Sequence, residues 1–357
     1  MKDSFQREIN YIRISITDQC NLCCRYCRPQ GGTDRCGGVP QANACYLTCE
    51  EFVEVVEAAA ALGITRVKVT GGEPLLCKDC CRLIGELKRI PGIGQVTLTT
   101  NGVLLEKRLP ELLEAGLDAV NVSLDTVHAD VFRQLTGVDA YEDVRRGIQA
   151  ALAAGLPVKI NSVLLRGIND GEWRELAELA GPQPLQVRFI ELMPIGAAGG
   201  STAAGCRRGA PIVYRADAKA PLPLTGISGD EILRRLREAY PDLQEDDAVH
   251  GNGPAKYVHI PGFQGSIGFI SALHGKFCAD CNRIRLTSTG RLKPCLCYSE
   301  SVDMRSILRG PTPRAPSSRR QALCAAIREA VLAKPGGHCF DRPEEITEEA
   351  PMSGIGG

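Results

Sequence analysis

The sequence lacks several features that mark common classes of protein. Its 42 basic residues equal its 42 acidic residues, so no net charge draws the chain toward nucleic acid or an anionic membrane. No run of about 18 apolar residues occurs, as a membrane-spanning helix would need. The opening MKDSFQREIN has no apolar leader segment. We therefore expect a cytoplasmic protein that binds neither nucleic acid nor a membrane.

Familiar catalytic motifs are missing as well. There is no GxxxxGK[ST] loop, so a nucleoside triphosphate would have to be bound by side chains. There is no HExxH motif, carboxylate pair or Ser/His/Asp arrangement, and the five histidines are dispersed. Catalysis must therefore come from another kind of residue.

Cysteine is present in excess. Seventeen cysteines, clustered and odd in number, favour metal ligation over a disulfide framework in a reducing compartment. The densest group is DQCNLCCRYC at residues 18–27. Six cysteines without useful spacing are interpreted as bystanders: Cys36, Cys45, Cys49, Cys206, Cys324 and Cys339.

The first group contains the spacing Cys20-x3-Cys24-x2-Cys27. Three thiolates can hold three irons of a four-iron cluster and leave the fourth iron open. Cys23 is adjacent to Cys24, so their side chains diverge and we interpret Cys23 as a bystander. The alternative is a closed four-cysteine zinc site, although structural zinc usually uses paired CxxC knuckles.

A second group follows in FCADCNRIRLTSTGRLKPC, with Cys278, Cys281 and Cys295 as a further triple. Arg283 and Arg285 alternate on one strand face beside these thiols. Their guanidinium groups suit a phosphate ligand. Two alternatives remain open: a structural zinc site that adds Cys297, and a solvated basic strand.

Short β-branched runs alternate with helical patterns between residues 11 and 195, which predicts an α/β fold with a parallel sheet. The sheet is either open and doubly wound or a curved partial barrel. Polar sequences follow the strands (TGGEP, TTNG, SLD, ELMP), at the ends where barrels place their sites. The predicted strands are YIRISIT, ITRVKVT, QVTLTT, LDAVNVSL, PVKINSVLL and LQVRFIEL.

Helix boundaries and domain divisions follow from capping residues and composition. Thr48 and Glu51 form a capping-box pattern for a helix over 49–62, and Gly63, Gly116 and Gly155 are expected to end helices. Further expectations are a helix over 230–240, a basic loop at 310–320, a helix over 321–333 and an irregular tail. The predicted parts are a barrel (1–196), a flexible insertion (197–226), a C-terminal domain with the second cysteine triple (227–340) and a tail (341–357).

The cysteine triple after the first strand resembles the signature of the radical S-adenosylmethionine (SAM) superfamily. Tyr26 and the GGEP run from Gly71 to Pro74 extend the resemblance. It implies a partial (βα)6 TIM-like barrel and an iron–sulfur cluster whose open iron binds the amino and carboxylate groups of SAM. Reductive cleavage of SAM would release a 5′-deoxyadenosyl radical.

Most of the chain resembles the GTP 3′,8-cyclase family of radical SAM enzymes. The motifs are YIRISITDQCNLCCRYC, VKVTGGEPLL, LTTNG, VNVSLD, VKINSVLLRGIND, VRFIELMPIG, FCADCNRIRLTSTGRLKPCL and the terminal MSGIGG. The resemblance implies two [4Fe–4S] clusters and SAM as cofactors. It implies conversion of GTP to (8S)-3′,8-cyclo-7,8-dihydroguanosine 5′-triphosphate, a lyase reaction that begins molybdenum cofactor biosynthesis.

The resemblance also implies roles for individual residues. Cluster ligands would be Cys20, Cys24 and Cys27 in the first cluster, and Cys278, Cys281 and Cys295 in the second. SAM contacts would be Tyr26, Gly71, Gly72, Glu73, Ser123 and Met193. GTP contacts would be Arg13, Lys68, Thr99, Lys159, Arg188, Arg283, Ile284 and Arg285. The C-terminal Gly356 and Gly357 would enter the active site, and with Arg283 and Arg285 would support catalysis.

The family resemblance implies partners, and the sequence also departs from the family. An external electron donor is expected, the product would pass to cyclic pyranopterin monophosphate synthase, and a homodimer is possible. Lys68 stands where the family commonly has arginine, which keeps the charge but loses the bidentate fork. CKDCC at 77–81 replaces more basic residues, and the segments 31–49 and 197–226 are unusual.

Two rival functions fit the sequence less well. A peptide-modifying radical SAM enzyme with auxiliary clusters would not explain the arginines after Cys281 or the diglycine end. An iron–sulfur or zinc regulatory protein gives no reason for GGEP on a six-strand α/β scaffold.

Overall fold

The computed structural model describes residues 1–357 except 28–45, 196–223, 249, 276, 311–314 and 356–357. Its centre is one sheet of twelve strands in the order β12-β11-β10-β1-β2-β3-β4-β5-β6-β9-β8-β7. The strands are β1 (Tyr11–Ser15), β2 (Arg66–Thr70), β3 (Gln95–Thr100), β4 (Ala119–Ser123), β5 (Val158–Ser162), β6 (Gln186–Ile190), β7 (Gln244–Asp246), β8 (Lys256–His259), β9 (Ser266–Ile270), β10 (Arg283–Leu286), β11 (Arg291–Lys293) and β12 (Val302–Asp303).

The first six strands pair in parallel in chain order, as the βα alternation predicted. β9 adds in parallel to β6 and β10 adds in parallel to β1, so eight parallel strands form the curved middle of the sheet. The antiparallel strands lie outside them at both ends. The curved partial-barrel prediction is therefore confirmed, and strands after residue 227 extend the same sheet at both ends.

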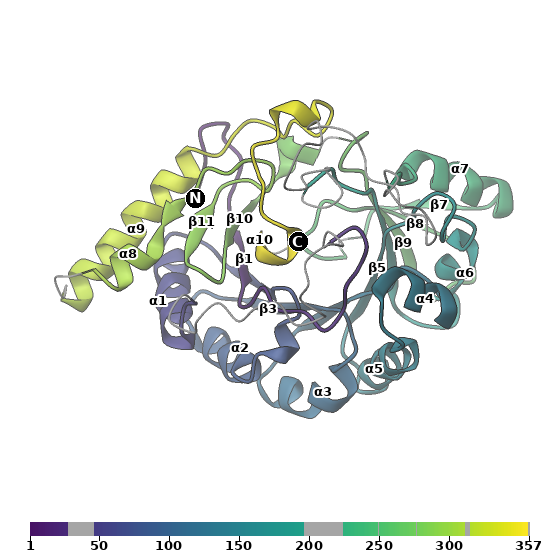
Figure 1. The fold of residues 1–357 in the computed structure, drawn as a ribbon, viewed down its shortest axis with the longest axis horizontal. Coiled ribbons are helices and arrows are strands. Elements are labelled where there is room, and N and C mark those ends of the chain that lie inside the picture. The colour runs from purple at the N-terminus through teal and green to yellow at the C-terminus, as the bar shows by residue number, and fades with distance from the viewer. Residues whose placement is uncertain (28–45, 196–223, 249, 276, 311–314, 356–357) are drawn as a thin grey trace, which may run out of the picture.

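Helices surround the curved sheet on its outer side, while the C-terminal segment reaches the middle of the ring (Figure 1). The helices are α1 (Cys49–Ala60), α2 (Cys80–Arg89), α3 (Leu105–Glu114), α4 (Ala129–Thr136), α5 (Tyr141–Ala153), α6 (Trp173–Glu178), α7 (Gly229–Ala239), α8 (Met304–Leu308), α9 (Pro316–Leu332) and α10 (Met352–Ile355). Short 3-10 turns span Pro74–Leu76, Phe277–Asp280 and Pro343–Glu345.

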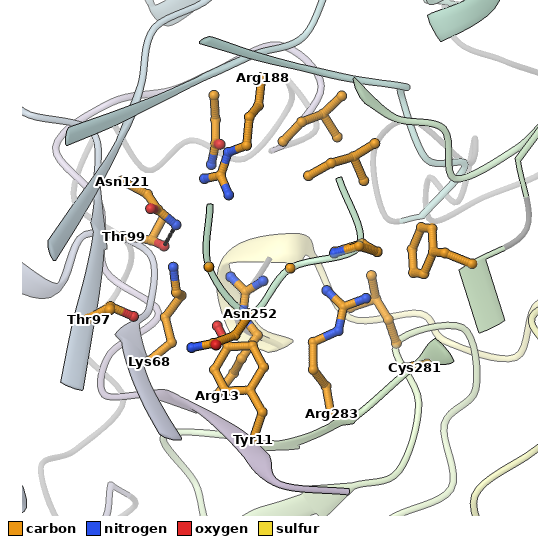
Figure 2. Close-up of a pocket in the computed structure, with 18 of the residues that line it drawn as sticks. Tyr11, Arg13, Lys68, Thr97, Thr99, Asn121, Arg188, Asn252, Cys281 and Arg283 are labelled. Atoms are coloured by element: carbon orange, nitrogen blue, oxygen red, sulfur yellow. Dashed lines mark hydrogen bonds between the residues drawn. The ribbon is translucent and has the colours of Figure 1, made fainter. Parts of the chain in front are cut away.

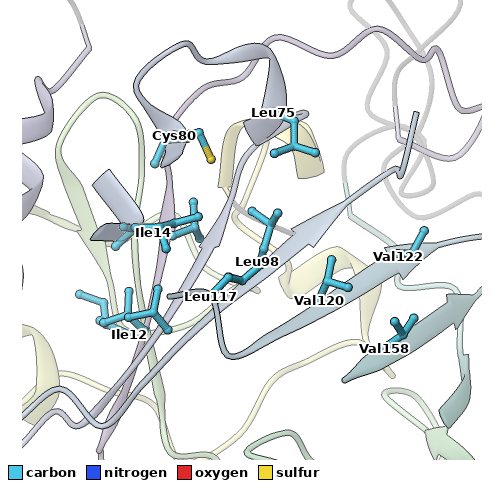
Figure 3. Close-up of a cluster of buried hydrophobic side chains, with 14 of the residues drawn as sticks. Ile12, Ile14, Leu75, Cys80, Leu98, Leu117, Val120, Val122 and Val158 are labelled. Atoms are coloured by element: carbon cyan, nitrogen blue, oxygen red, sulfur yellow. The ribbon is translucent and has the colours of Figure 1, made fainter. Parts of the chain in front are cut away.

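The hydrophobic core fills the layer between the strands and the outer helices (Figure 3). Ile12 and Ile14 of β1 are fully buried there, and Leu98 and Val120 continue the layer across β3 and β4. Full burial of such a side chain stabilises the fold by about 1.5–3 kcal/mol. Because side chains alternate along a strand, the residues between these positions point into the barrel.

Local signals set most of the element ends as predicted. Thr48 Oγ1 accepts from Glu51 N at 3.3 Å and Glu51 Oε2 accepts from Thr48 N at 2.8 Å, which completes the capping box of α1. Gly63, Gly116 and Gly155 all have positive φ after their helices, as expected.

Three boundaries differ from the sequence interpretation or fall outside the description. The helix predicted over 321–333 begins earlier, at Pro316, because proline at the first helical position removes no hydrogen bond, so the basic loop is shorter than predicted. Most of the insertion predicted at 197–226 lies outside the described residues. Its last residues are packed: Leu224 is buried and Gly226 bridges Leu165.

Candidate functional site

Two neighbouring cavities lie inside the curved sheet, and we name them by their linings. The cysteine-loop chamber, about 180 Å³, lies at the carboxyl ends of the strands. It is lined by Cys20, Leu22, Cys24, Tyr26, Cys27, Thr70, Gly71, Gly72, Thr99, Thr100, Asn101, Ser123, Val163, Ile190, Glu191, Leu192, Met193, Met352 and Ser353. The cationic chamber, about 450 Å³, extends deeper into the barrel.

The loop after β1 places Cys20, Cys24 and Cys27 together on the wall of the cysteine-loop chamber. Cys20 Sγ accepts from Leu22 N at 3.4 Å and from Asn101 Nδ2 at 3.7 Å. Burial, followed by the nearby Cys27, raises the pKa of Cys24 well above its ordinary value. A thiolate at this position therefore needs a compensating cation, which a metal cluster supplies.

Cys23 is disulfide-bonded, an exception to the expectation that the cysteines are not cross-linked. It does not line the chamber, and its backbone N–H donates to Thr136 O at 2.8 Å. Because a cystine sulfur cannot act as a thiolate ligand, this state is compatible with Cys23 as a bystander.

The GGEP run packs directly against the cysteine loop. A Cβ atom on Gly72 would lie 2.3 Å from Gln19 O, so only glycine permits this approach. Gly72 N donates to Thr17 O and Glu73 N donates to Gln19 O, both at 2.7 Å. These bonds hold the strand end against the backbone that carries the cysteines.

Glu73 lies behind the chamber rather than on its wall. Its carboxylate accepts from Leu75 N at 3.0 Å, Thr100 Oγ1 at 2.7 Å and Asn101 N at 2.6 Å. Burial raises the pKa of Glu73 to about 7, although these three donors oppose the rise. The described position thus makes Glu73 a link between the loops after β2 and β3.

The remaining residues predicted to contact SAM surround the same space. Tyr26, Ser123 and Met193 line the cysteine-loop chamber. Tyr26 Oη donates to Asp125 Oδ2 at 2.8 Å, and burial raises the pKa of Asp125 to about 6. This hydrogen bond ties the Tyr26 side chain to the segment that follows β4.

The cationic chamber takes its charge from inward-facing positions of the parallel strands (Figure 2). Cross-strand register places Arg285, Arg13 and Lys68 side by side on β10, β1 and β2. Asn161 on β5 is opposite Arg188 on β6. The cations that line the chamber are Arg13, Lys68, Lys159, Arg188, Arg283, Arg285 and Lys334.

Burial is the main reason that several of these cations have depressed pKa values. It lowers the pKa of Lys159 to about 8 and that of Arg13 to about 10, and the Arg188 charge adds to both effects. It lowers the pKa of Lys68 well below the usual lysine value. A polyanion in this chamber would relieve both the mutual repulsion and the lost hydration.

The second cysteine triple lies on the wall of the cationic chamber. Cys278 belongs to the 3-10 turn Phe277–Asp280, Cys281 lies between that turn and β10, and Cys295 follows β11. Burial alone would raise the pKa of Cys281, but the Arg283 and Lys334 charges outweigh it and lower the pKa to about 7. These surroundings favour the thiolate that an iron–sulfur cluster requires.

The cysteine geometry also addresses the zinc alternative. Within the described part of the chain, no group of three or more His, Cys, Asp or Glu side chains is placed to hold one metal ion. A structural zinc ion needs four ligands around a single point. Each thiolate of a four-iron cluster binds a different iron, and each cysteine triple faces a cavity in which such a cluster could lie.

The predicted GTP contacts divide into two groups. Arg13, Lys68, Lys159 and Arg188 line the cationic chamber, as do Thr99, Arg283 and Arg285. Ile284 does not: its side chain is fully buried in the hydrophobic core on the other side of β10. Strand alternation explains this separation between neighbouring residues.

The two chambers share part of their walls. Thr99, Ile190, Met193 and Met352 line both cavities. Met352 belongs to α10 in the tail, and Ser353 beside it lines the cysteine-loop chamber. Gly356 and Gly357, predicted to enter the site, lie outside the described residues.

Several residues at the site were not found from the sequence. Asn101 contacts Cys20 in the cysteine-loop chamber. Lys334 donates to Arg283 O at 2.9 Å and to Pro294 O at 2.7 Å. Residues 250–254 line the cationic chamber. Asn101 lies in the polar TTNG sequence after a strand, which was a usable signal. Lys334 and the 250–254 loop are far from the cysteine motifs and gave no such signal.

The surplus cysteines that the structure describes are mostly packing residues. Cys49 and Cys80 belong to the hydrophobic core, and burial raises the pKa of each thiol. Cys297 and Cys339 are also buried, with their sulfur atoms 3.1 Å apart. Cys36, Cys45 and Cys206 fall outside the described residues.

Among the helices of the described residues, none combines the length and the apolar character of a membrane span.

Comparison with solved structures shows the fold. Over 96% of this chain, a crystal structure of Streptococcus suis SuiB matches with a TM-score of 0.54 and 15% identity, and 77% of that chain is covered. A second SuiB structure, bound to S-adenosylmethionine, matches with a TM-score of 0.55 and 16% identity over 97% of this chain and 77% of that one.

Sequence comparisons define the family. The Radical SAM superfamily model matches residues 14–180, and the Molybdenum Cofactor Synthesis C model matches residues 185–340. The GTP 3′,8-cyclases of Moorella thermoacetica and Desulforamulus reducens are 41% and 40% identical to this chain, each over 100% of both proteins. That of Pelotomaculum thermopropionicum is 41% identical with the same coverage. The chain belongs to the GTP 3′,8-cyclase family of radical SAM enzymes.

Proposed function

We propose that this enzyme converts GTP to (8S)-3′,8-cyclo-7,8-dihydroguanosine 5′-triphosphate, the first step of molybdenum cofactor biosynthesis, using SAM and two [4Fe–4S] clusters. The shared wall of the two chambers carries the proposal. One chamber presents thiols and glycine backbone, and the other presents cations suited to a triphosphate. A reaction between their two ligands requires such a junction.

Cys20, Cys24 and Cys27 would hold the first cluster, leaving one iron for SAM. When bound, this cluster would supply the electron for reductive cleavage of SAM, and the radical chemistry that follows would start at C3′ of GTP. The chain would position the reactants: the backbone of Gly71 and Gly72 and the side chains of Tyr26, Ser123 and Met193 border the space proposed for SAM. Glu73 would act by fixing Asn101 rather than by touching SAM.

On the substrate side, Cys278, Cys281 and Cys295 would hold the second cluster beside Arg283 and Arg285. That cluster would orient guanine, while the buried cations hold the triphosphate. Fixing both ends of GTP brings C3′ to the wall formed by Thr99, Ile190, Met193 and Met352. The C3′ carbon and guanine C8 are then held in one geometry, which lowers the entropic barrier to ring closure.

The tail and the reaction partners belong to the same proposal. Met352 and Ser353 bring the tail to the cysteine-loop chamber, so Gly356 and Gly357 would continue from this point into the site. The product would pass to cyclic pyranopterin monophosphate synthase in the cytoplasm, and an external donor would reduce the clusters. A homodimer is the proposed assembly.

An anaerobic assay of the reconstituted, reduced enzyme tests the proposal. SAM is supplied with and without GTP, and 5′-deoxyadenosine and the cyclised nucleotide are followed by mass spectrometry. Both products are expected together. Deoxyadenosine without a GTP product would contradict the proposed substrate while keeping the SAM chemistry. Absence of both from protein with intact clusters would contradict the proposed activity.

A further inference from the structure

A glycine-rich loop, residues 250–254 (HGNGP), lies between β7 and β8 and forms one side of the cationic chamber. All five residues line that chamber, and none lines the cysteine-loop chamber. The same chamber is bordered by Gln95 at the start of β3, Pro157 before β5 and Gln186 at the start of β6. The loop therefore closes the amino-terminal end of the barrel interior, away from the cysteine loop.

Gly251 brings the loop backbone against the head of Lys159. A Cβ atom on Gly251 would lie 2.8 Å from Lys159 Nζ, and its φ of +135° disfavours any other residue. Gly253 differs: a Cβ there would be 3.8 Å from Arg188 Nη1, an ordinary contact, and Gly253 is not among the positive-φ glycines. Of these two glycines, Gly251 is therefore the one whose missing side chain leaves room for a neighbouring cation.

Side-chain contacts hold the loop in place. Asn252 Nδ2 donates to Gln95 Oε1 across the chamber. His250 Nε2 lies 2.7 Å from Asp246 Oδ2, and the His250 and Tyr257 rings are 4.5 Å apart. Tyr257 in turn forms a hydrogen bond with Arg188. The hairpin is thus connected to two of the cations that face the cavity.

The ends of a bound nucleotide can be assigned from these positions, given the proposed function. The ribose must lie at the wall shared by the chambers, and guanine lies beside the second cysteine triple. The phosphate chain is then left to extend toward the cations that the loop contacts. Lys159 and Arg188 are those cations.

We propose that the 250–254 loop determines specificity for the terminal phosphate, because Gly251 leaves the space that the Lys159 ammonium occupies at the loop end of the chamber. This inference rests on the proposed function. The loop selects a nucleoside triphosphate over its diphosphate, because only the longer chain reaches the loop end of the chamber. Asn252 supports the same function by tying the loop to β3.

The test compares Gly251→Ala with the control Gly171→Ala in the reconstituted enzyme. Gly171 lines neither chamber, and a Cβ atom there would meet nothing within 4 Å. Binding of GTP, GDP and GMP is measured by anaerobic calorimetry. For Gly251→Ala we expect a loss of GTP affinity of about tenfold, as for one charge-assisted contact, with GMP affinity unchanged. Gly171→Ala should bind all three nucleotides like the parent enzyme. An equal loss for all three with Gly251→Ala would overturn the proposal.

Asn252→Ala covers the case in which Gly251→Ala misfolds, which iron content and thermal unfolding would reveal, and a double-mutant cycle tests the coupling to Lys159. Asn252→Ala leaves both glycines intact and should lower the preference for GTP over GDP. Gly251→Ala should have no further effect when Lys159 is already Met, since its effect acts through that side chain. Additive losses would refute the coupling. Failure of the parent enzyme to bind GTP would instead contradict the proposed function itself.

Discussion

The two chambers of this enzyme differ in the chemical groups that form their walls. The cysteine-loop chamber is built from thiols, glycines and backbone hydrogen bonds, and Glu191 is its one acidic lining residue among those described. The cationic chamber is built from long basic side chains on at least five strands. SAM, a sulfonium cation whose amino and carboxylate groups would bind a metal, needs no group of basic side chains, whereas a triphosphate needs several cations. The comparison teaches that the two ligands are recognised by different physical means.

The largest effect is expected from removing a thiol of the cysteine-loop chamber. Cys24→Ser should reduce SAM cleavage to background, beyond the roughly 10–100-fold that loss of an outer-shell partner causes. Iron content and deoxyadenosine formation are the measurements. Cys23→Ser is the matched control and should keep both, and an equal loss in the two variants would contradict the ligand assignment.

A smaller effect is expected from removing one basic side chain of the cationic chamber. Arg283→Ala should weaken GTP binding by about 10–150-fold, the equivalent of one charged hydrogen bond worth about 1.5–3 kcal/mol. SAM cleavage without GTP should persist, because Arg283 does not line the other chamber. Arg291→Ala, at an exposed position on neighbouring β11, is the control. Lost iron in Arg283→Ala would indicate a structural role instead.

The charge of the cationic chamber should also show in the pH dependence of GTP binding. The pKa of Lys159 is about 8 without ligand, and a bound triphosphate raises it. The protonated form binds, so affinity should be constant below about pH 8 and fall above it, by at most tenfold per pH unit. Calorimetry over pH 7–9.5, a range chosen to bracket that pKa, measures this. Lys159→Arg should remove the fall in GTP affinity at high pH. If the affinity falls as before, another group causes the fall.

The smallest effect tests whether a polar side chain also helps to retain the cluster in the cysteine-loop chamber. Asn101→Ala removes the contact with Cys20 Sγ and should lower cluster retention or shift its redox potential, with a loss of no more than about tenfold. Asn121→Ala, from the inner face of β4 beside Thr99, is a control that leaves the cysteine loop untouched. If neither iron content nor redox potential changes, backbone donors alone are enough to hold the cysteine loop around the cluster.

Local patterns predicted much of the fold. The strand over Gln95–Thr100 was predicted with its observed bounds, and the Thr48 capping box was found where expected. The start of α9 was missed, because the basic composition before residue 321 hid the helix signal of Pro316. Ile284 illustrates a limit of residue-by-residue transfer, since strand alternation turns its side chain into the core.

The sequence by itself determined the two cysteine triples, the strand–helix alternation and the placement of Arg283 and Arg285 on one strand face. Each of these depends on residues within one short segment or on a period of two along a strand. Only the tertiary structure decided that Asn101 reaches Cys20, that Lys334 borders the second triple, and that the 250–254 loop meets Lys159. These contacts join segments about 40 to 90 residues apart, because the parallel sheet brings distant strand ends together and leaves no local trace in the chain.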